Sequence, residues 1–478
     1  MNIILKGFDD WCGKPIIETA FRGLRIGTCI SILNDRKQWP DLDTEEHIWM
    51  PASPLREGRY PDVNWMNITP LDEELVESMR HCEAVFLRMV ERYARYGDLP
   101  YEERLRQYRE HLRYWNHMLE TKKIGLVLMY TLPHQCYDLV IYDLCKLKGI
   151  PVLYLARYYL VDAFSVETDW QEVGKALQER LLQLQKQYAD TEKPVPLTDR
   201  FENYFQSFTR VDADPWYMFR RGKHLEYRSF LRKWAGIAIL IAFFKPAYFL
   251  RSVVSPSFWA RKWKQHRTAM TYDRFTKTPD LSLPYVYVPL HMQPEATTCP
   301  MGGVYADQEL MVQILAAHLP EGVRLYVKEH PAQGEMCRST AFYEALHAIP
   351  SVSLVPRHFS TFALRDNALA IASVTGTACF EGLFHEKPAL MFGHQFFQFA
   401  PGVFRIRSAQ DCARAFKVIM EKKEAHTIRD MRLFLKAIEE TTQPYAGAPP
   451  SPHMPLSKEE KAVGMGRVIA ERLQPYFR

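Results

Sequence analysis

The sequence lacks the short motifs that identify several common enzyme classes. It has no Gly-x-x-x-x-Gly-Lys-Ser/Thr loop and no Gly-x-Gly-x-x-Gly after the first expected strand, and it contains neither Gly-x-Ser-x-Gly nor His-Glu-x-x-His. These absences argue against P-loop nucleotide hydrolases, dinucleotide-dependent dehydrogenases, α/β-hydrolase esterases and zinc proteases.

The cysteine pattern gives little support for disulfides or structural zinc. The nine cysteines are scattered and never form Cys-x-x-Cys, and no cationic, apolar leader opens the chain. Reduced thiols in a cytoplasmic protein are therefore expected, with no metal site and no cofactor.

Long hydrophobic runs are also missing. The most apolar stretch, 234–244, has about half of the roughly 20 residues that a bilayer-spanning helix needs. It lies in the basic segment 220–267, which contains twelve Lys and Arg residues and a single acidic residue, Glu226. Cations and aromatics around an apolar helix favour peripheral contact with the anionic inner face of the cytoplasmic membrane. An ordinary buried helix with a basic rim is the alternative, and the basic segment is weak evidence for nucleic-acid binding.

What the chain has in abundance is alternating strand and helix patterns. At 478 residues with 47% hydrophobic content it can form about two or three domains. Strands are expected at 2–7, 27–33, 124–130 and 151–155, and again at 285–290, 324–327, 352–355, 368–373 and 389–392, with helices between them. This pattern predicts an α/β protein with two Rossmann-like domains facing across a cleft. The predicted divisions are 1–165, a helical insertion at 166–280, a second domain at 281–455, and a returning helix at 456–478.

Polar clusters follow three strands of the predicted second domain. In an open parallel sheet, such strand ends are where ligands usually bind. In the first cluster, the extended segment at 291–295 should place alternate side chains on one face, where they could contact a sugar. These side chains are His291, Gln293 and Glu295. A polar loop that makes only its own turn hydrogen bonds is the alternative.

The second cluster is Lys328-Glu-His330-Pro331. Pro331 favours an extended residue before it, which aims His330 out of the sheet edge. There His330 could donate a hydrogen bond to a phosphate or carboxylate, and Lys328 could add positive charge. A structural histidine at a strand end is the alternative.

The third cluster opens a helix. Thr375, Gly376 and Thr377 should expose backbone amides at a helix amino terminus, which is suited to a phosphate. Glu381, one turn further on, could accept hydrogen bonds from a ribose. Alternatively, Thr377 only caps the helix and Glu381 is a surface acid.

Two places in the predicted first domain could supply a general base. Asp9 and Asp10 follow the opening strand, and His134 follows the strand at 124–130. A carboxylate or imidazole at this edge could deprotonate a sugar hydroxyl. Asp10 could equally serve only to begin a turn.

With these residues in view, the chain resembles capsule and surface-polysaccharide glycosyltransferases of bacteria that have the two-domain GT-B fold. The likeness is closest to groups that use Kdo or sialic acid, and it covers about the last 200 residues. The matching segments are 290–298 with Asp307-Gln308, 327–331, and 373–381 with Lys387-Pro388. Asp9-Asp10 is followed by Trp11, which departs from the Asp/Glu-Asp/Glu-Gly motif of one sialyltransferase group.

The resemblance implies metal-independent transfer of a sugar, with CMP as the expected nucleotide, to a glycan or lipid-linked glycan. His330, Thr375 and Thr377 would contact the nucleotide phosphate, and an acid of the first domain would be the base. Two other functions stay open: a sugar-nucleotide 2-epimerase, and a non-catalytic glycan- or nucleotide-binding member of a capsule assembly complex.

Overall fold

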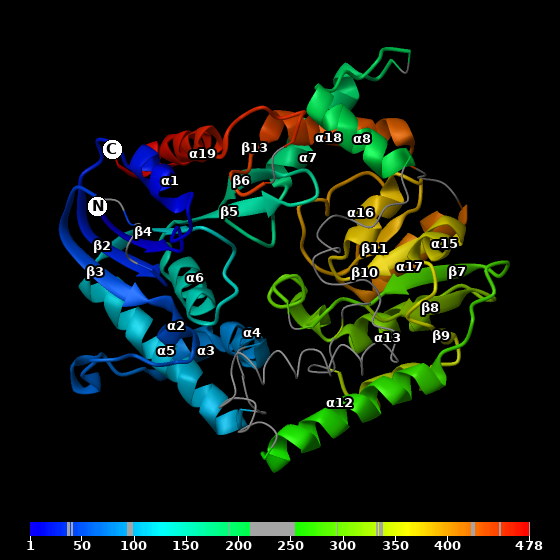
Figure 1. Ribbon diagram of the computed structural model, residues 1–478, viewed down its shortest axis with the longest axis horizontal. Coiled ribbons are helices and arrows are strands. Elements are labelled where there is room, and N and C mark those ends of the chain that lie inside the picture. Colours follow the sequence, from blue (N-terminus) through cyan, green and yellow to red (C-terminus); the bar gives the residue numbers. More distant parts are fainter. Residues whose placement is uncertain are drawn as a thin grey trace.

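The computed structural model describes residues 1–35, 39, 42–92, 99–190, 192–210, 254–293, 295–330, 333, 338–421, 426–448 and 451–477. Its strands form two separate sheets with helices packed around them (Figure 1). Most of the basic segment 220–267, including the apolar stretch 234–244, lies outside the described residues, as does Pro331.

The first sheet has the strand order β13-β6-β5-β4-β1-β2-β3. Strands β1 to β5 run parallel, whereas β6 and β13 are antiparallel additions at one edge. Its strands are β1 (Asn2–Lys6), β2 (Ile26–Leu33), β3 (Thr44–Pro51), β4 (Ile124–Met129), β5 (Val152–Tyr158), β6 (Ala163–Glu167) and β13 (Gln443–Pro444). The central strands β1 and β4 are almost wholly buried, as expected of a parallel sheet with both faces covered.

Helices cover both faces of this sheet. They are α1 (Gly13–Ala20), α2 (Ala52–Arg56), α3 (Glu73–Ser78), α4 (Arg80–Met89), α5 (Tyr101–Thr121), α6 (Tyr137–Lys148) and, from the end of the chain, α19 (Lys458–Leu473), with 3₁₀ turns η1 (Trp65–Asn67), η2 (Val90–Arg92) and η4 (Gln474–Tyr476). Helix α19 lies beside α1, and Met465 and Ile469 share an apolar cluster with Ile16 and Ile17 (Figure 1). The last helix therefore completes the cover of the first sheet.

The second sheet has the order β12-β11-β10-β7-β8-β9, and all its paired strands are parallel. Its strands are β7 (Tyr285–Pro289), β8 (Arg324–Lys328), β9 (Val352–Val355), β10 (Ala370–Ser373), β11 (Ala389–Met391) and β12 (Val403–Arg405). Around it lie α12 (Pro256–Phe275), η3 (Gly303–Ala306), α13 (Gln308–His318), α14 (Thr340–Ala348), α15 (Thr361–Asn367), α16 (Thr377–Leu383) and α17 (Ala409–Glu421).

The two sheets are joined by packing between distant parts of the chain. Helix α7 (Lys175–Gln187) packs against α18 (Ile428–Thr441), which also contacts α8 (Asp199–Arg210) (Figure 1). The ring of Tyr158, at the end of β5, stacks on Phe396 with centroids 4.5 Å apart. The backbone carbonyl of Gln171 accepts hydrogen bonds from His394 and Gln398. The carboxyl end of β5 thus lies against the loop that follows β11.

The predicted fold class is confirmed: each half is a mostly parallel α/β sheet of the Rossmann-like kind. Strands β3, β6, β12 and β13 and helices α2, α15, α17 and α18 were not predicted. Within the described residues, no helix combines the length and the apolar character that crossing a membrane requires.

Candidate functional site

The three polar clusters predicted in the second half lie at neighbouring strand ends. Strand β7 pairs with β10 on one side and with β8 on the other, and all three run parallel. Their last residues, Pro289, Lys328 and Ser373, therefore reach the same edge, and the Ser373 hydroxyl donates to the carbonyl of Pro289 at 3.3 Å. The convergence inferred from the sequence follows from this strand order.

His291 is the centre of this edge. Gln308, the first residue of α13 and 1% exposed, accepts from the His291 backbone N–H at 2.7 Å and donates to its carbonyl at 3.2 Å. The imidazole Nε2 accepts a hydrogen bond from the backbone N–H of Thr375 at 3.0 Å. An accepting Nε2 places the proton of the neutral ring on Nδ1. Burial lowers the pKa of His291 to about 3, and the charges of His330 and Arg338 act in the same direction, so the ring is neutral at pH 7.

The expectation for Thr375 is corrected by these contacts. Its backbone N–H is bonded to His291, and its hydroxyl donates to the carbonyl of Thr297 at 2.7 Å, while the residue is 1% exposed. Both groups predicted to bind a phosphate are therefore used inside the protein. Thr377 does begin α16, as predicted, with Gly376 at the helix N-cap, and both residues are partly exposed. For them, phosphate binding stays a prediction.

Gly376 is required by close packing. A Cβ built on it would lie 2.6 Å from the Ser373 hydroxyl and 3.3 Å from Nε2 of His291. The backbone before α16 approaches the histidine more closely than a larger residue allows.

A buried ion pair supports the same edge from behind. The Arg338 Nε lies 3.0 Å from Oε2 of Glu329, and the two side chains are 2% and 0% exposed. Arg338 also donates to the His291 carbonyl at 2.8 Å, and Tyr343 donates to Glu329 at 2.6 Å. Burial alone would raise the pKa of Glu329, but Arg338, with smaller contributions from the charge of Arg357 and the hydrogen bond of Tyr343, holds it below the usual value.

Gln293 and Lys328 differ from their predicted roles. The Gln293 side chain donates to the carbonyl of Ala306 and accepts from Arg338, and its backbone is held by Gln333 at 2.8 and 3.1 Å. Gln293 is therefore a structural residue, and its side chain is not available to bind a sugar. Lys328 is only 2% exposed, whereas its predicted role required an accessible charge.

His330 keeps its predicted position. It is partly exposed, its backbone N–H donates to Glu329 at 2.8 Å, and its charge acts on the pKa of His291. His330 therefore lies close to the histidine that touches the start of α16. A role in ligand binding stays a prediction.

Glu295 and Glu381 face the other sheet. Burial raises the pKa of Tyr159, which follows β5, and the negative charges of Glu295 and Glu381 raise it further. Both acids are partly exposed. The carboxyl ends of β5, β7 and β10 thus meet near Tyr159.

On the first sheet, Asp9 and Asp10 both accept hydrogen bonds, Asp9 from the loop after β2 and Asp10 within its own turn. Asp9 accepts from the backbone and side-chain nitrogens of Asn34 at 2.6 and 2.9 Å. Asp10 accepts from the Cys12 backbone N–H at 3.3 Å and from its thiol at 3.0 Å. Burial raises the pKa of Cys12 to about 12, so this thiol is a proton donor. The turn alternative for Asp10 is therefore supported, and neither carboxylate is set up as a free base.

His134 has a defined tautomer. Its Nδ1 lies 2.7 Å from the carbonyl of Leu132, which can only accept, so Nε2 is the basic nitrogen. Burial lowers the pKa of His134 to about 4, and the charge of Lys6 acts in the same direction. Lys6 itself forms a buried ion pair with Asp138 at 2.9 Å, the side chains being 4% and 0% exposed.

One arginine connects the two edges. Arg92 donates from one nitrogen to the carbonyl of His134 at 2.8 Å and from another to the carbonyl of Cys299 at 2.7 Å. Cys299 lies in the loop between β7 and α13. The His134 loop of the first sheet is therefore held against the loop that follows the His291 strand.

Arg338 and Arg92 were missed because neither lies at a predicted strand end. Their partners are mostly backbone carbonyls far along the chain, which leave no local pattern. Gln308 could have been identified from the sequence, because it belongs to a segment that carried the family resemblance.

Strand order, register and the meeting of the two carboxyl edges define an α/β protein with two Rossmann-like sheets. The family model described as capsule polysaccharide biosynthesis protein matches residues 261–435. The match runs from α12 into α18 and includes every residue of the second-sheet edge named above. The resemblance to capsule polysaccharide biosynthesis proteins is thus confirmed for this segment.

No curated protein sequence matches the chain. Among solved structures, a UDP-GlcNAc 2-epimerase from Methanocaldococcus jannaschii is 11% identical, with 92% of this chain and 98% of that chain covered and a TM-score of 0.26. The KpsC beta Kdo 2,7 transferase of Thermosulfurimonas dismutans is 10% identical, with 84% and 97% covered and a TM-score of 0.31. The KpsC beta Kdo 2,4 transferase of the same organism is 14% identical, with 66% and 79% covered and a TM-score of 0.28. TM-scores this low carry no argument about activity.

Proposed function

We propose that this protein is a metal-independent glycosyltransferase of capsule or surface polysaccharide biosynthesis. The donor is a nucleotide sugar, with a CMP-linked acidic sugar such as Kdo or a sialic-acid-like sugar as the first candidate. The acceptor is a glycan or lipid-linked glycan. The family match over residues 261–435 supports the pathway, and the grouping of His291 and His330 at one sheet edge supports a donor site there.

The observation that carries the proposal is the bridge made by Arg92. It holds the His134 loop against the loop that follows β7, so groups from both halves are within one region. A transferase needs this arrangement, because the acceptor hydroxyl and the donor sugar must meet in a defined orientation.

In the proposed reaction, His291 and His330 serve the leaving nucleotide. The Nδ1 proton of His291 is placed for donation, because Nε2 is occupied by Thr375. Hydrogen bonds to a developing phosphate charge are the electrostatic contribution that dominates such transfers. On the acceptor side, Nε2 of His134 is the candidate base. Its pKa of about 4 makes it a weak base at neutral pH, so it acts best on a proton that is already leaving.

Nucleotide binding tests the donor assignment. The full chain is heated with CMP, CDP, UDP or GDP, and stabilisation by CMP is expected to exceed that by the others. Stabilisation by UDP alone would overturn the CMP assignment. The variant His330→Ala should keep its fold but lose the CMP effect.

Turnover tests the activity. Released CMP and elongated acceptor are measured with a CMP-linked acidic sugar, and His291→Ala is expected to reduce transfer by orders of magnitude. Near-normal transfer in His291→Ala would eliminate its role. Epimerised free sugar without an acceptor would favour an epimerase, and binding without turnover would favour a non-catalytic assembly component.

Peripheral membrane contact is part of the proposal. On α12, Trp259 and Trp263 are 55% and 62% exposed, and Arg267 lies over the Trp263 ring at 5.6 Å. Exposed aromatics with cations are typical of helices that lie in a membrane surface. Flotation with anionic vesicles is expected for the native chain and should weaken in Trp259→Ser/Trp263→Ser. Equal flotation of both proteins would contradict this contact.

A further inference from the structure

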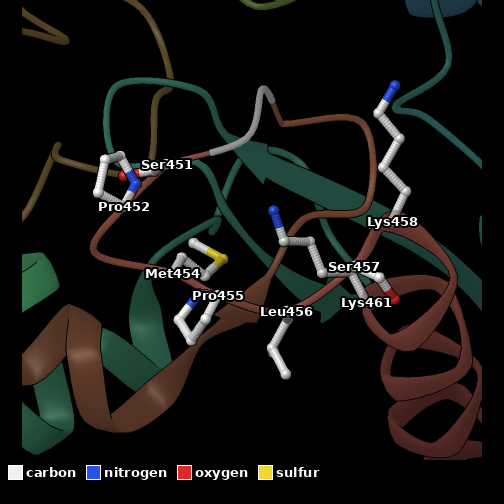
Figure 2. A pocket seen from close by; sticks show the side chains of 8 residues that line it. All are labelled: Ser451, Pro452, Met454, Pro455, Leu456, Ser457, Lys458 and Lys461. Carbon is white, nitrogen blue, oxygen red and sulfur yellow. The ribbon is translucent and has the colours of Figure 1, made fainter.

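An open pocket of about 490 Å³ lies where the chain enters α19. The lining residues come from the segment before the helix and from its first turn (Figure 2): Ser451, Pro452, Met454, Pro455, Leu456, Ser457, Lys458 and Lys461. The two lysines are the only titratable residues of this lining.

Within the part of the chain that the structure describes, Lys461 is largely buried and has no partner of opposite charge in contact. Its side chain is 2% exposed, and neither a hydrogen bond nor a salt bridge joins its ammonium to any residue in the described part of the chain. In Figure 2 the side chain extends from α19 into the space enclosed by the preceding segment. A lysine whose side chain is largely buried and lacks an ion-pair partner is costly, so such a group usually has a ligand or a counter-ion.

The charges around Lys461 are mostly positive. Burial lowers the pKa of Lys461, the charges of Arg200 and Lys458 lower it further, and only Asp162 acts in the opposite direction. The Tyr204 hydroxyl donates to Oδ2 of Asp162 at 3.2 Å, while Oδ1 is buried without a hydrogen-bond partner among the described residues. One carboxylate therefore faces three cations, which leaves a local excess of positive charge.

The helix start adds to this field, although two of its amide groups are already used. Ser457 and Glu460 form a capping box: the Ser457 hydroxyl accepts from the Glu460 N–H at 3.1 Å, and Glu460 accepts from the Ser457 N–H at 2.7 Å. An anion in the pocket would therefore bind to lysine ammonium groups and hydroxyls, with the helix dipole as a secondary contribution.

We propose that this pocket binds an oxyanion carried by a saccharide, either the carboxylate of an acidic sugar or a phosphate, with Lys461 as its main cationic contact. Lys458 lines the same pocket, and its Nζ lies 5.2 Å from the centre of the Trp11 ring. Trp11 is 46% exposed and follows Asp10 at the edge of the first sheet. The pocket thus adjoins the half expected to hold the acceptor. That the anion belongs to the acceptor rests on the proposed function, whereas binding of the anion does not.

Equilibrium dialysis of the full chain tests the site with labelled inorganic phosphate and labelled glucuronate, and glucose serves as the neutral probe. Lys461→Met is expected to weaken binding by about 10- to 100-fold, the usual loss for a hydrogen bond to a charged group. Lys461→Arg should stay within a few-fold of the native chain. Lys417→Met removes an exposed lysine of α17 as the matched control and should change nothing.

The unliganded melting temperature of Lys461→Met separates a lost ligand contact from misfolding. It should equal or exceed the native value, because the variant removes an unpartnered buried charge. Binding of phosphate alone or of glucuronate alone supports the site and shows whether its ligand carries a phosphate or a carboxylate. Unchanged affinity in Lys461→Met, binding of glucose as strong as that of glucuronate, or no binding of either anion overturns the proposal. Failure of the CMP experiment would leave this result intact.

Discussion

Replacing Arg338 by Met should destabilise the second sheet strongly. Arg338 and Glu329 are 2% and 0% exposed and 3.0 Å apart, so the variant leaves a buried carboxylate without its cation. Removing one partner of such a pair costs about 3–5 kcal/mol. The carbonyl of His291 also loses a donor at 2.8 Å, so the strand ends should loosen together. The free energy of unfolding in urea measures the total. Hydrogen exchange of β7 and β8 locates the loss.

The pH dependence of the same variant has a definite sign. In the native chain the pKa of Glu329 is held below its ordinary value, so its contribution to stability is present at neutral pH and is lost as pH falls below about 4.5. In Arg338→Met, burial without the cation should raise the pKa of Glu329. As the pH falls from 7, Glu329 of the folded variant therefore binds a proton at a higher pH than Glu329 of the unfolded chain does, and this proton binding stabilises the folded variant. The stability difference between the two proteins should therefore narrow from pH 7 to pH 4.5.

Two further variants decide whether this reasoning holds. The double variant Arg338→Met/Glu329→Met removes both charges and should recover most of the lost stability, because no unpaired charge remains. Arg324→Met removes an exposed arginine of β8 and should change stability by about 0.5 kcal/mol or less. A loss of about 1 kcal/mol or less in Arg338→Met would refute the account of the ion pair.

Three other predictions concern the edge around α16. The pKa of His291 is about 3 when folded against an ordinary 6.5, so the unfolded chain binds the proton first and stability falls as pH drops below 6.5. This amounts to about 2 kcal/mol at pH 5. His291→Gln should remove that part of the pH dependence, and an unchanged urea profile would contradict it. Thr375→Val should lose about 1–3 kcal/mol, because a buried carbonyl loses its donor, whereas an unchanged melting temperature would show the hydroxyl to be dispensable. In Gly376→Ala the added carbon would lie 2.6 Å from the Ser373 hydroxyl, and stabilisation by the nucleotide should fall several-fold. Gly464→Ala, which meets open space in α19, is its control.

Much of the fold could be predicted because its signals are local. Alternation of apolar runs with helical spacing gave the central strands of both sheets and indicated helices between them, such as α5 between β3 and β4. Strand β3 was missed because its first half is polar at the sheet edge, with Glu45 and Glu46 exposed and His47 partly exposed. Strand β13 has only two residues and exists through its pairing with β6, which no local pattern encodes.

The site could be predicted at the level of strand ends and no further. The sequence indicated that His291, His330 and the start of α16 would converge, because the carboxyl ends of parallel strands share an edge. It could not indicate which polar groups would be used up inside the protein. Thr375 and Gln293 look like ligand-binding residues in the sequence, yet their partners, Thr297, Ala306 and Arg338, hold them in the structure.

His291 and His134, the two histidines of the candidate site with a defined tautomer, carry their proton arrangement in opposite senses: His291 has Nε2 as hydrogen-bond acceptor, and His134 has Nδ1 as hydrogen-bond donor. On the second sheet, Thr375 donates to Nε2 of His291, so the ring carries its proton on Nδ1 and can donate it. On the first sheet, Nδ1–H of His134 donates a hydrogen bond to the carbonyl of Leu132, so Nε2 of His134 can accept a proton. Both rings are neutral at pH 7, because burial lowers each pKa well below its ordinary value. A transfer reaction requires a proton donor beside the departing phosphate and a proton acceptor beside the attacking hydroxyl. In the proposed transfer, the backbone groups that hold each ring therefore give His291 the donor role and His134 the acceptor role. Arg92 keeps their two loops together.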